Sequence, residues 1–291
     1  MIKKPIVAIM YDFDKTLCTE DEQNYKFIPD VSMTPDEFWA KTGLFSKKAD
    51  MERILSYMYM MIIEAQRHGF SITKNYLNDL GKSVVYQKGL TAWFKRINEY
   101  GERHGVKVEH YIISSGLVDI INGTSISKEF KGIYACEFLY DEKTGAAIWP
   151  KLTINYTLKT QYIFRISKGV TKLEDDDAVN ERVSKENRRV LYKDMIYIGD
   201  GITDIPCMQL VKDKGGLSIA IYGEKYAANA AKLDNAERVT HICKADYGVN
   251  STLDEIVKLR IKEVAIRHRL AMKSKNQSKL VEEYENVQKG E

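Results

Sequence analysis

The first apolar run of the chain is Val7-Ala8-Ile9-Met10-Tyr11, and Asp12-Phe13-Asp14-Lys15-Thr16 follows it directly. Two carboxylates at the end of a buried strand are unfavourable, because like charges then lie close together where the core begins. Side chains two apart in a strand share a face, so Asp12 and Asp14 are expected to converge at the strand end. The stretch therefore predicts a divalent-cation site or, as the plainer alternative, a polar turn leaving a sheet.

Composition and charge describe a globular chain. Of its 291 residues, 44% are hydrophobic and 29% charged, which suits one large domain with a smaller module. The net charge of +3 is too small to indicate nucleic acid binding. No run approaches the roughly 18 apolar residues of a membrane span, and the start lacks a signal-type segment. Since the four cysteines are scattered, without metal-ligand spacing, we expect a soluble cytoplasmic protein acting on neither membrane nor nucleic acid.

The segment from residue 18 to residue 88 has a helical pattern. Thr34, Pro35 and Glu37 form a capping-box start, and residues 50–68 carry apolar side chains at helical spacing before Gly69. Because no convincing strand occurs here, we interpret 18–88 as a helical insertion of the cap type. Residues 1–17 and 89–291 would then form the core domain.

After Gly89 the pattern alternates between helices and strands, which favours an α/β fold with a parallel sheet. We predict helices at 90–103, 117–122 and 157–166, strands at 106–113, 195–198, 217–222 and 239–243, and a hairpin at 134–140 and 146–152. A further helix is expected to begin near Glu224, and one long helix, basic as far as Lys279, from Thr252. The polar stretch 169–193 begins acidic and ends basic, as a solvated helix matched to its macrodipole would, and we interpret it as a surface insertion.

Polar side chains stand at the ends of several of these elements. They are Asp12 and Asp14 after the first strand, Ser114 after the second, Lys159 in the first turn of a helix, and Asp200 and Asp204 after a later strand. The carboxyl ends of parallel strands lie along one edge of a sheet, and ligands bind in the crevice there. These side chains are therefore expected to form one site.

These motifs, in this order from residue 5 to about residue 245, resemble the four motifs of the haloacid dehalogenase superfamily. They are Asp12-x-Asp14-x-Thr16, a strand ending in Ser114, a helix opened by Lys159, and Gly199-Asp200-Gly201-x-x-Asp204. The helical insertion resembles the cap of the phosphoserine phosphatase-like branch. The resemblance implies a Rossmann-like core with a C1-type helical cap.

The resemblance also implies a function, the hydrolysis of a small phosphate monoester through an aspartyl-phosphate. Asp12 would be the nucleophile and Asp14 the general acid and base, while Ser114 and Lys159 would hold phosphoryl oxygens. An acid at the position of Asp14 favours a phosphatase over a dehalogenase. The expected cofactor is Mg²⁺.

The same resemblance implies the residues around the metal and the substrate. Mg²⁺ would be held by Asp12, Asp200 and the backbone carbonyl of Asp14, with Asp204 in the same metal site. The expected substrate-binding residues are Thr16, Ser115, Asp21 and Arg53, of which Asp21 would face an amine and Arg53 a carboxylate. Alternatively, Asp21 belongs to a solvated turn and Arg53 to a surface ion pair.

Other interpretations stay open at this point. Lys168 and Lys172 are alternatives to Lys159, because the polar stretch separates Lys159 from Asp200 by an unusual length. The aspartyl-phosphate would serve a phosphotransferase equally well. A non-catalytic scaffold with a vestigial metal site and a partner on its basic last helix is the alternative from another class. The similarity of Asp14-Lys15-Thr16 to ion-pumping ATPases fails, because Leu17-Cys18 follows and no membrane span is present.

Overall fold

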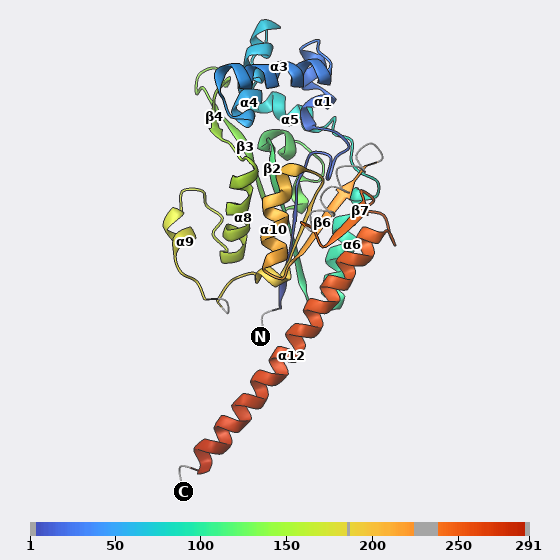
Figure 1. The fold of residues 1–291 in the computed structure, drawn as a ribbon, viewed down its shortest axis with the longest axis vertical. Helices are drawn as coiled ribbons and strands as arrows, with labels where there is room; N and C mark the ends of the chain where they lie inside the picture. Colours follow the sequence, from blue (N-terminus) through green and yellow to red (C-terminus); the bar gives the residue numbers. More distant parts are fainter. Residues whose placement is uncertain (1–3, 185–186, 224–237, 289–291) are drawn as a thin grey trace.

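The structure, a computed structural model, describes residues 4–184, 187–223 and 238–288. Its strands are β1 (Ile6–Tyr11), β2 (Lys107–Leu117), β3 (Gly132–Tyr140), β4 (Ala147–Leu152), β5 (Met195–Gly199), β6 (Leu217–Tyr222) and β7 (His241–Lys244). They form one seven-stranded sheet of order β4-β3-β2-β1-β5-β6-β7 (Figure 1). Every neighbouring pair is parallel except the β3–β4 hairpin, so the predicted α/β fold is confirmed.

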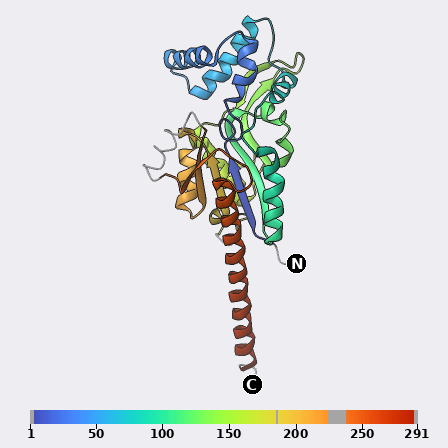
Figure 2. The same ribbon diagram turned by 90° about the vertical axis from the view of Figure 1, so that its right-hand side faces the viewer.

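Helices cover both faces of the sheet and one of its edges. They are α1 (Glu22–Tyr25), α2 (Phe27–Asp30), α3 (Pro35–Ala49), α4 (Arg53–Arg67), α5 (Lys74–Gly81), α6 (Leu90–Arg103), α7 (Val118–Asn122), α8 (Tyr156–Lys168), α9 (Asp176–Asn180), α10 (Ile205–Asp213) and α12 (Thr252–Gln288), with 3-10 turns at Ser127–Glu129, Tyr192–Asp194 and Ile202–Asp204. Helices α8 and α10 pack together on one face, and α6 lies on the other with the beginning of α12 (Figure 2).

Strand β1 lies at the centre of the sheet, and all of its residues are buried. It pairs in parallel with β2 on one side and with β5 on the other. The pairing with β5 continues past the strand, because the Asp12 amide donates to the Ile198 carbonyl at 3.0 Å. The carboxyl ends of β1, β2 and β5 therefore lie at one edge, as the sequence predicts for parallel strands.

Helices α1 to α5 form a layer beyond this edge (Figure 1). The predicted capping box opens α3, where the Glu37 amide donates to Thr34 Oγ1 at 3.3 Å and the Thr34 amide to Glu37 Oε2 at 2.8 Å. The two connectors to the sheet run antiparallel, with a bridge between Cys18 and Tyr86. The β3–β4 hairpin reaches the layer, since the Ala147 amide donates to the Ile72 carbonyl at 2.7 Å.

The polar stretch 169–193 is mostly exposed or half-buried in its described part, as the sequence predicts for a surface insertion. Within its described part, the α-helix covers only Asp176–Asn180. Its basic end packs on the sheet, because the Arg189 guanidinium donates to both Glu109 oxygens at 2.6 and 2.7 Å. Attraction to a buried carboxylate, which periodicity does not reveal, fixes this end. The helix expected near Glu224 lies outside the described residues.

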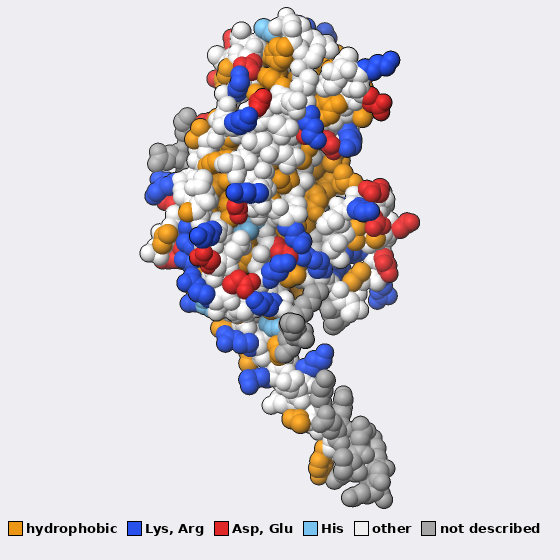
Figure 3. Space-filling model, turned by 180° about the vertical axis from the view of Figure 1, so that it is seen from behind, with side chains coloured by type: hydrophobic (Ala, Val, Ile, Leu, Met, Phe, Trp, Pro, Cys, Tyr) orange, Lys and Arg blue, Asp and Glu red, His pale blue; other side chains and the backbone are white. Residues whose placement is uncertain are grey.

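Helix α12 confirms the long helix predicted from Thr252, and it extends far beyond the sheet (Figure 1). Lys and Arg side chains gather where it leaves the body (Figure 3). Arg96 attaches its first turns to the body, through Asp254 Oδ1 at 3.2 Å and the Tyr247 carbonyl at 2.5 Å. Among the described residues, no helix has the length and apolar character needed to cross a membrane.

A chain of hydrogen bonds joins β1, β2 and α6 inside the core. Trp93 Nε1 donates to the Tyr11 hydroxyl at 2.8 Å, and that hydroxyl lies 2.9 Å from His110 Nδ1. His110 Nε2 lies 3.0 Å from Asn98 Oδ1, which can only accept, so we assign the proton of the neutral ring to Nε2. Burial lowers the pKa of His110 to about 3, so the ring stays neutral in the folded protein.

This histidine predicts a loss of stability in acid. Below a pH of about 6.5 the unfolded chain binds a proton that the folded ring does not accept, so folding becomes less favourable as pH falls. Relative to a His110→Gln variant, the free energy of unfolding should fall by about 1.4 kcal/mol per pH unit between pH 6 and pH 4. Urea unfolding across this range measures the difference, which should be constant above pH 7.5. Equal slopes for both proteins would contradict the assignment.

Candidate functional site

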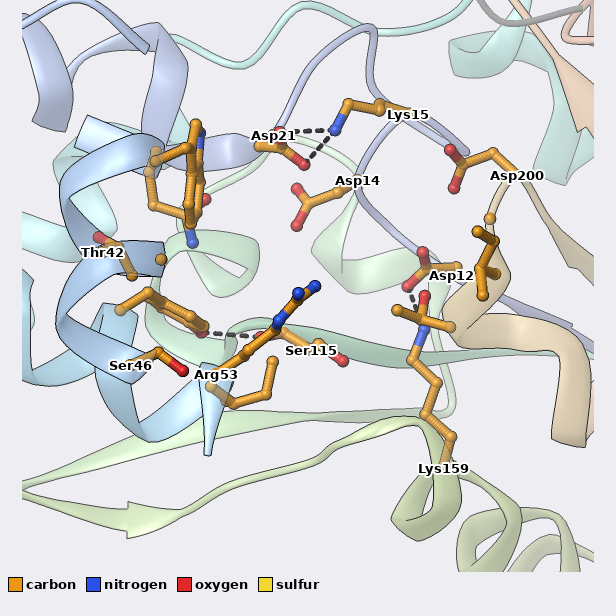
Figure 4. A pocket seen from close by; sticks show the side chains of 18 residues that line it. Asp12, Asp14, Lys15, Asp21, Thr42, Ser46, Arg53, Ser115, Lys159 and Asp200 are labelled. Atoms are coloured by element: carbon orange, nitrogen blue, oxygen red, sulfur yellow. Dashed lines mark hydrogen bonds and ion pairs between the residues drawn. The ribbon is translucent and has the colours of Figure 1, made fainter. Parts of the chain in front are cut away.

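A cavity of about 540 Å³ opens between the carboxyl edge of the sheet and the helical layer. Its floor contains Asp12, Asp14, Ser115, Lys159 and Asp200 (Figure 4). Asp12 and Asp14 follow β1, Ser115 lies near the end of β2, Lys159 lies in the first turn of α8, and Asp200 follows β5. Its wall comes from α1, α3 and α4, together with the loop after β1. The wall residues are Lys15, Asp21, Gln23, Trp39, Thr42, Gly43, Ser46, Arg53, Ile54 and Tyr57, and Gly201, Ile202 and Thr203 complete the rim.

Lys159 forms the centre of the charged floor. Helix α8 is capped by Asn155, which accepts from the Leu158 amide and so places Lys159 in the first turn. Its side chain is wholly buried, and Nζ lies 2.8 Å from both Asp12 Oδ1 and Asp204 Oδ1. Although burial alone lowers the pKa of Lys159, attraction to these two carboxylates raises it above the usual range. The lysine therefore stays charged and holds the two carboxylates together.

Asp204 is wholly buried and already has several donors. Besides Lys159, the Tyr197 hydroxyl donates to its Oδ1 at 2.7 Å and the Gly201 amide to its Oδ2 at 3.3 Å. Gly199 is required beside it, because a Cβ at that position would lie 2.4 Å from Asp204 Oδ2. Asp204 does not belong to the described residues that line the cavity. Its contacts suit a residue that positions Lys159.

Carboxylate oxygens of Asp12, Asp200 and Asp204 lie within 4.8 Å of one another. Burial, and next the charge of Asp204, raises the pKa of Asp12 to about 6. Burial and the charge of Asp12 raise the pKa of Asp200 well above its usual value. Clustered carboxylate oxygens, whose negative charge Lys159 offsets only in part, are the ligands that Mg²⁺ and Ca²⁺ take. The donor set therefore fits a divalent cation.

Asp14 occupies a different environment from Asp12. The Glu22 amide donates to Asp14 Oδ1 at 2.8 Å, which fixes one carboxyl oxygen. Burial raises the pKa of Asp14 well above its usual value, and the charges of Asp21 and Asp12 raise it further. A carboxyl group whose proton is retained toward neutral pH can donate that proton to a leaving group.

The two predicted serines lie on different sides of the floor. Ser114 is wholly buried, its Oγ accepts from the Gly116 amide at 2.9 Å, and the structure does not place it on the cavity. Ser115 lines the cavity instead, and its Oγ donates to the Ile154 carbonyl at 2.7 Å. The register of β2 with β3 shifts between Ile113 and Leu117, so simple alternation does not predict which serine faces outward.

Thr16 and the alternative lysine also lie away from the cavity surface. Thr16 is wholly buried, and its Oγ1 donates to Asp200 Oδ1 at 3.4 Å, so it contacts the site from behind. Lys168 Nζ donates to the carbonyls of Val179 and Glu181, outside the cavity lining. The other alternative, Lys172, is likewise absent from the described lining.

The predicted substrate-binding pair Asp21 and Arg53 lies on the cavity wall. Both Asp21 oxygens are 2.6 Å from Lys15 Nζ, so the carboxylate already has a cation. Arg53 begins α4, and its guanidinium points into the cavity (Figure 4). Among the residues described, no side chain or carbonyl pairs with that guanidinium.

Several wall residues escaped the sequence analysis. Lys15 directly follows Asp14, so its place in the motif was a signal that it would lie near the site. Its backbone has a positive φ of 56°, and Gln87 Nε2 holds its carbonyl at 3.1 Å. Gln23, Thr42 and Tyr57 gave no signal, because single polar residues on amphipathic helices are ordinary.

Comparisons with known proteins can now be set beside this geometry. No protein-family model matches the chain. An uncharacterized protein of Borreliella burgdorferi is 27% identical over 273 residues, which cover 84% of this chain and 93% of that relative. A HAD family hydrolase of Salmonella enterica serovar Typhi matches with a TM-score of 0.58 at 15% identity, covering 88% of this chain and 72% of the other.

Phosphoserine phosphatases share the same fold at similar identity. A substrate-bound phosphoserine phosphatase matches with a TM-score of 0.52 at 17% identity, covering 89% of this chain and 99% of the other. For a probable phosphoserine phosphatase of Vibrio cholerae the TM-score is 0.53 at 12% identity, over 91% and 67% of the two chains. The chain therefore has the haloacid dehalogenase-type fold, in the form that phosphoserine phosphatases also have.

Proposed function

We propose that the protein is a Mg²⁺-dependent phosphatase that hydrolyses a small phosphate monoester through an aspartyl-phosphate. The observation that carries the proposal is the joint placement of Asp12, Asp14, Lys159 and Asp200 on one cavity floor. This floor combines a carboxylate nucleophile, a proton donor, a fixed cation and a carboxylate metal ligand. The shared fold with HAD family hydrolases and phosphoserine phosphatases supports the same reaction class.

In this proposal Asp12 attacks the phosphorus and the leaving oxygen departs on the opposite side. Lys159, held 2.8 Å from Asp12, stabilises negative charge on the phosphoryl oxygens. Ser114 would support the cavity floor from inside the protein, because its Oγ accepts from the Gly116 amide. Asp12, Asp200 and the Asp14 carbonyl would hold Mg²⁺, with Asp204 positioning Lys159 beside them. When bound, Mg²⁺ would offset the carboxylate charge and polarise the phosphoryl group.

Asp14 would carry the proton in both halves of the reaction. Its raised pKa keeps a proton available for the leaving oxygen of the ester. After that step the resulting carboxylate can take a proton from the water that hydrolyses the aspartyl-phosphate. The bond from the Glu22 amide keeps the Asp14 carboxyl in place for both transfers.

We further propose that residues 18–88 act as a helical cap on this site. The two connectors pair at Cys18 and Tyr86, and α3 and α4 of the segment form much of the cavity wall. A cap over the floor would exclude water, which strengthens the interaction of Lys159 with the phosphoryl oxygens.

We also propose a cytoplasmic location. All four cysteines are free and buried, and none forms a disulfide. Free thiols are typical of reducing compartments.

Removing divalent cations tests the proposed reaction. Purified protein should hydrolyse p-nitrophenyl phosphate with Mg²⁺, and EDTA should lower the rate at least ~100-fold, because the carboxylate charge would then repel the phosphate dianion. Excess Mg²⁺ should restore the rate, while sodium chloride of equal ionic strength should not. Full turnover in EDTA would contradict the metal-dependent mechanism, and release of phosphate to an added alcohol would indicate a phosphotransferase.

A further inference from the structure

We propose that the leaving group of the substrate is a hydroxy acid, and that the Lys15–Asp21 ion pair selects against leaving groups that carry an ammonium group. The inference rests on the proposed phosphatase function and names its substrate class. It follows from the charges and the unpaired polar atoms of the cavity wall.

The acidic residue of the cavity wall is already paired with a cation. Asp21 is the acidic residue among the described wall residues, and Lys15 Nζ lies 2.6 Å from each of its oxygens. Both side chains are about three-quarters buried, with exposed fractions of 25% and 26%, so water screens the pair only in part. The pair leaves no net negative charge on the wall to attract an ammonium group.

The wall also carries a cation, Arg53. The Arg53 guanidinium points into the cavity and lacks a partner among the described residues (Figure 4). The N-terminus of α4 is occupied by Glu52, whose Oε2 accepts from the amides of Ile54 and Leu55 at 2.7 and 3.0 Å. Glu52 is thereby committed to the helix end. A planar guanidinium binds a carboxylate through two parallel hydrogen bonds, so the leaving group should carry an acid.

Two buried polar atoms of the wall lack a hydrogen-bond partner among the described residues. Gln23 Oε1 and Thr42 Oγ1 are buried without a hydrogen-bond partner, and both residues line the cavity. Gln23 is 2% exposed and Thr42 is 5% exposed, so neither is a surface group. Buried polar atoms are nearly always paired, and leaving one unpaired is unfavourable. These atoms are therefore suited to a polar group of the ligand.

The charges of the wall, and not its unpaired atoms, favour a hydroxyl over an ammonium group. Gln23 Oε1 and Thr42 Oγ1 can both accept a hydrogen bond, so they require a polar group without selecting between the two. An ammonium group would lose water beside Arg53 and Lys15, two cations, and the acidic wall residue Asp21 is already paired with Lys15. A leaving group with one carboxylate and one hydroxyl fits every step.

Two substrates that differ only at this position provide the test. Racemic 3-phosphoglycerate and racemic O-phosphoserine share a carbon skeleton, a carboxylate and a phosphate, but carry a hydroxyl and an ammonium group at C2. The wild-type protein should hydrolyse 3-phosphoglycerate with a kcat/KM about 10-fold higher or more, since like-charge contacts strongly disfavour binding. An equal or higher kcat/KM for O-phosphoserine would overturn the proposal.

Variants of the ion pair assign the preference to its residues. In Lys15→Met the Asp21 carboxylate is freed, so the ratio of the two kcat/KM values should move toward O-phosphoserine by about 10-fold. In Asp21→Asn the wall loses a negative charge while the Lys15 cation stays, so the ratio should move the other way. Circular dichroism checks that each variant folds. If Lys15→Met does not fold, the ratio of kcat/KM values in Asp21→Asn tests the role of the ion pair. A ratio that stays constant in the folded variants would contradict the role of the pair.

Turnover of p-nitrophenyl phosphate separates this inference from the proposed function. This substrate has neither carboxylate nor ammonium group, so it reports the floor of the cavity alone. Its hydrolysis together with a preference for O-phosphoserine would overturn the hydroxy acid inference and leave the phosphatase. Absence of all turnover with Mg²⁺ would overturn both.

Discussion

An Asp12→Asn variant is expected to lose phosphatase turnover by about 10³-fold or more, because an amide is a poor nucleophile and a weak metal ligand. The exchange preserves the shape of a side chain that is 6% exposed at the end of β1. The loss should therefore appear in kcat. Single-turnover measurements with p-nitrophenyl phosphate would detect it.

The same variant should not be less stable without metal. Asp12 lies among Asp200 and Asp204, and its pKa is raised to about 6 by burial and by the charge of Asp204. Removing one charge from this group relieves repulsion above pH 6, so the thermal unfolding temperature in EDTA should be equal or higher. Asp79→Asn is the matched control, since Asp79 is exposed and pairs with Lys82. Undiminished turnover in Asp12→Asn would contradict its role as nucleophile.

A Lys159→Met variant is expected to lose about 3–5 kcal/mol of unfolding free energy at pH 8, because it leaves a buried cluster of carboxylates without its cation. Lys159 Nζ is the shared partner of Asp12 and Asp204, 2.8 Å from each, and the lysine is wholly buried. Urea unfolding in EDTA measures the loss. Lys82→Met, which breaks an exposed ion pair with Asp79, should cost at most about 1 kcal/mol.

The pH dependence of this loss has a definite sign. At pH 8 the carboxylates are charged and repel one another, so the loss is complete. Below pH 6 the Asp12 carboxyl takes up a proton in the folded protein, and the loss should become smaller. Adding Asp204→Asn to Lys159→Met should restore part of the stability at pH 8. A loss that does not depend on pH, or no rescue by the second substitution, would contradict the electrostatic explanation.

Most of the fold could be predicted because its elements have strong local signals. The six apolar residues of β1 end in charges, and the capping box at Thr34 marks the start of α3. The stretch 169–193 was predicted as a surface insertion, but its arrangement was not predicted, since it depends on the contact between Arg189 and Glu109, 80 residues apart. Local periodicity contains no information on such a contact.

The candidate site was predictable to a similar extent. Asp12, Asp14, Lys159 and Asp200 were expected at one sheet edge, and all line one cavity. The positions of Ser114 and Ser115 depend on an irregular strand register, which no residue type announces. The wall of the cavity depends on how the helices pack on the sheet, and sequence spacing does not determine this.

The antiparallel connectors at Cys18 and Tyr86 have a consequence for how such a protein can be re-engineered or diversified. The chain leaves the sheet and returns to it at one place, but a segment grafted there would have to replace two contacts with β2. The Leu117 amide donates to Glu22 Oε1, and the Tyr57 hydroxyl donates to the Ser115 carbonyl at 2.7 Å. The floor of the cavity comes from the sheet and α8, and much of the wall comes from the insertion. The cavity wall is nevertheless shared between the two parts of the chain, because Lys15 precedes residue 18 while its partner Asp21 follows it.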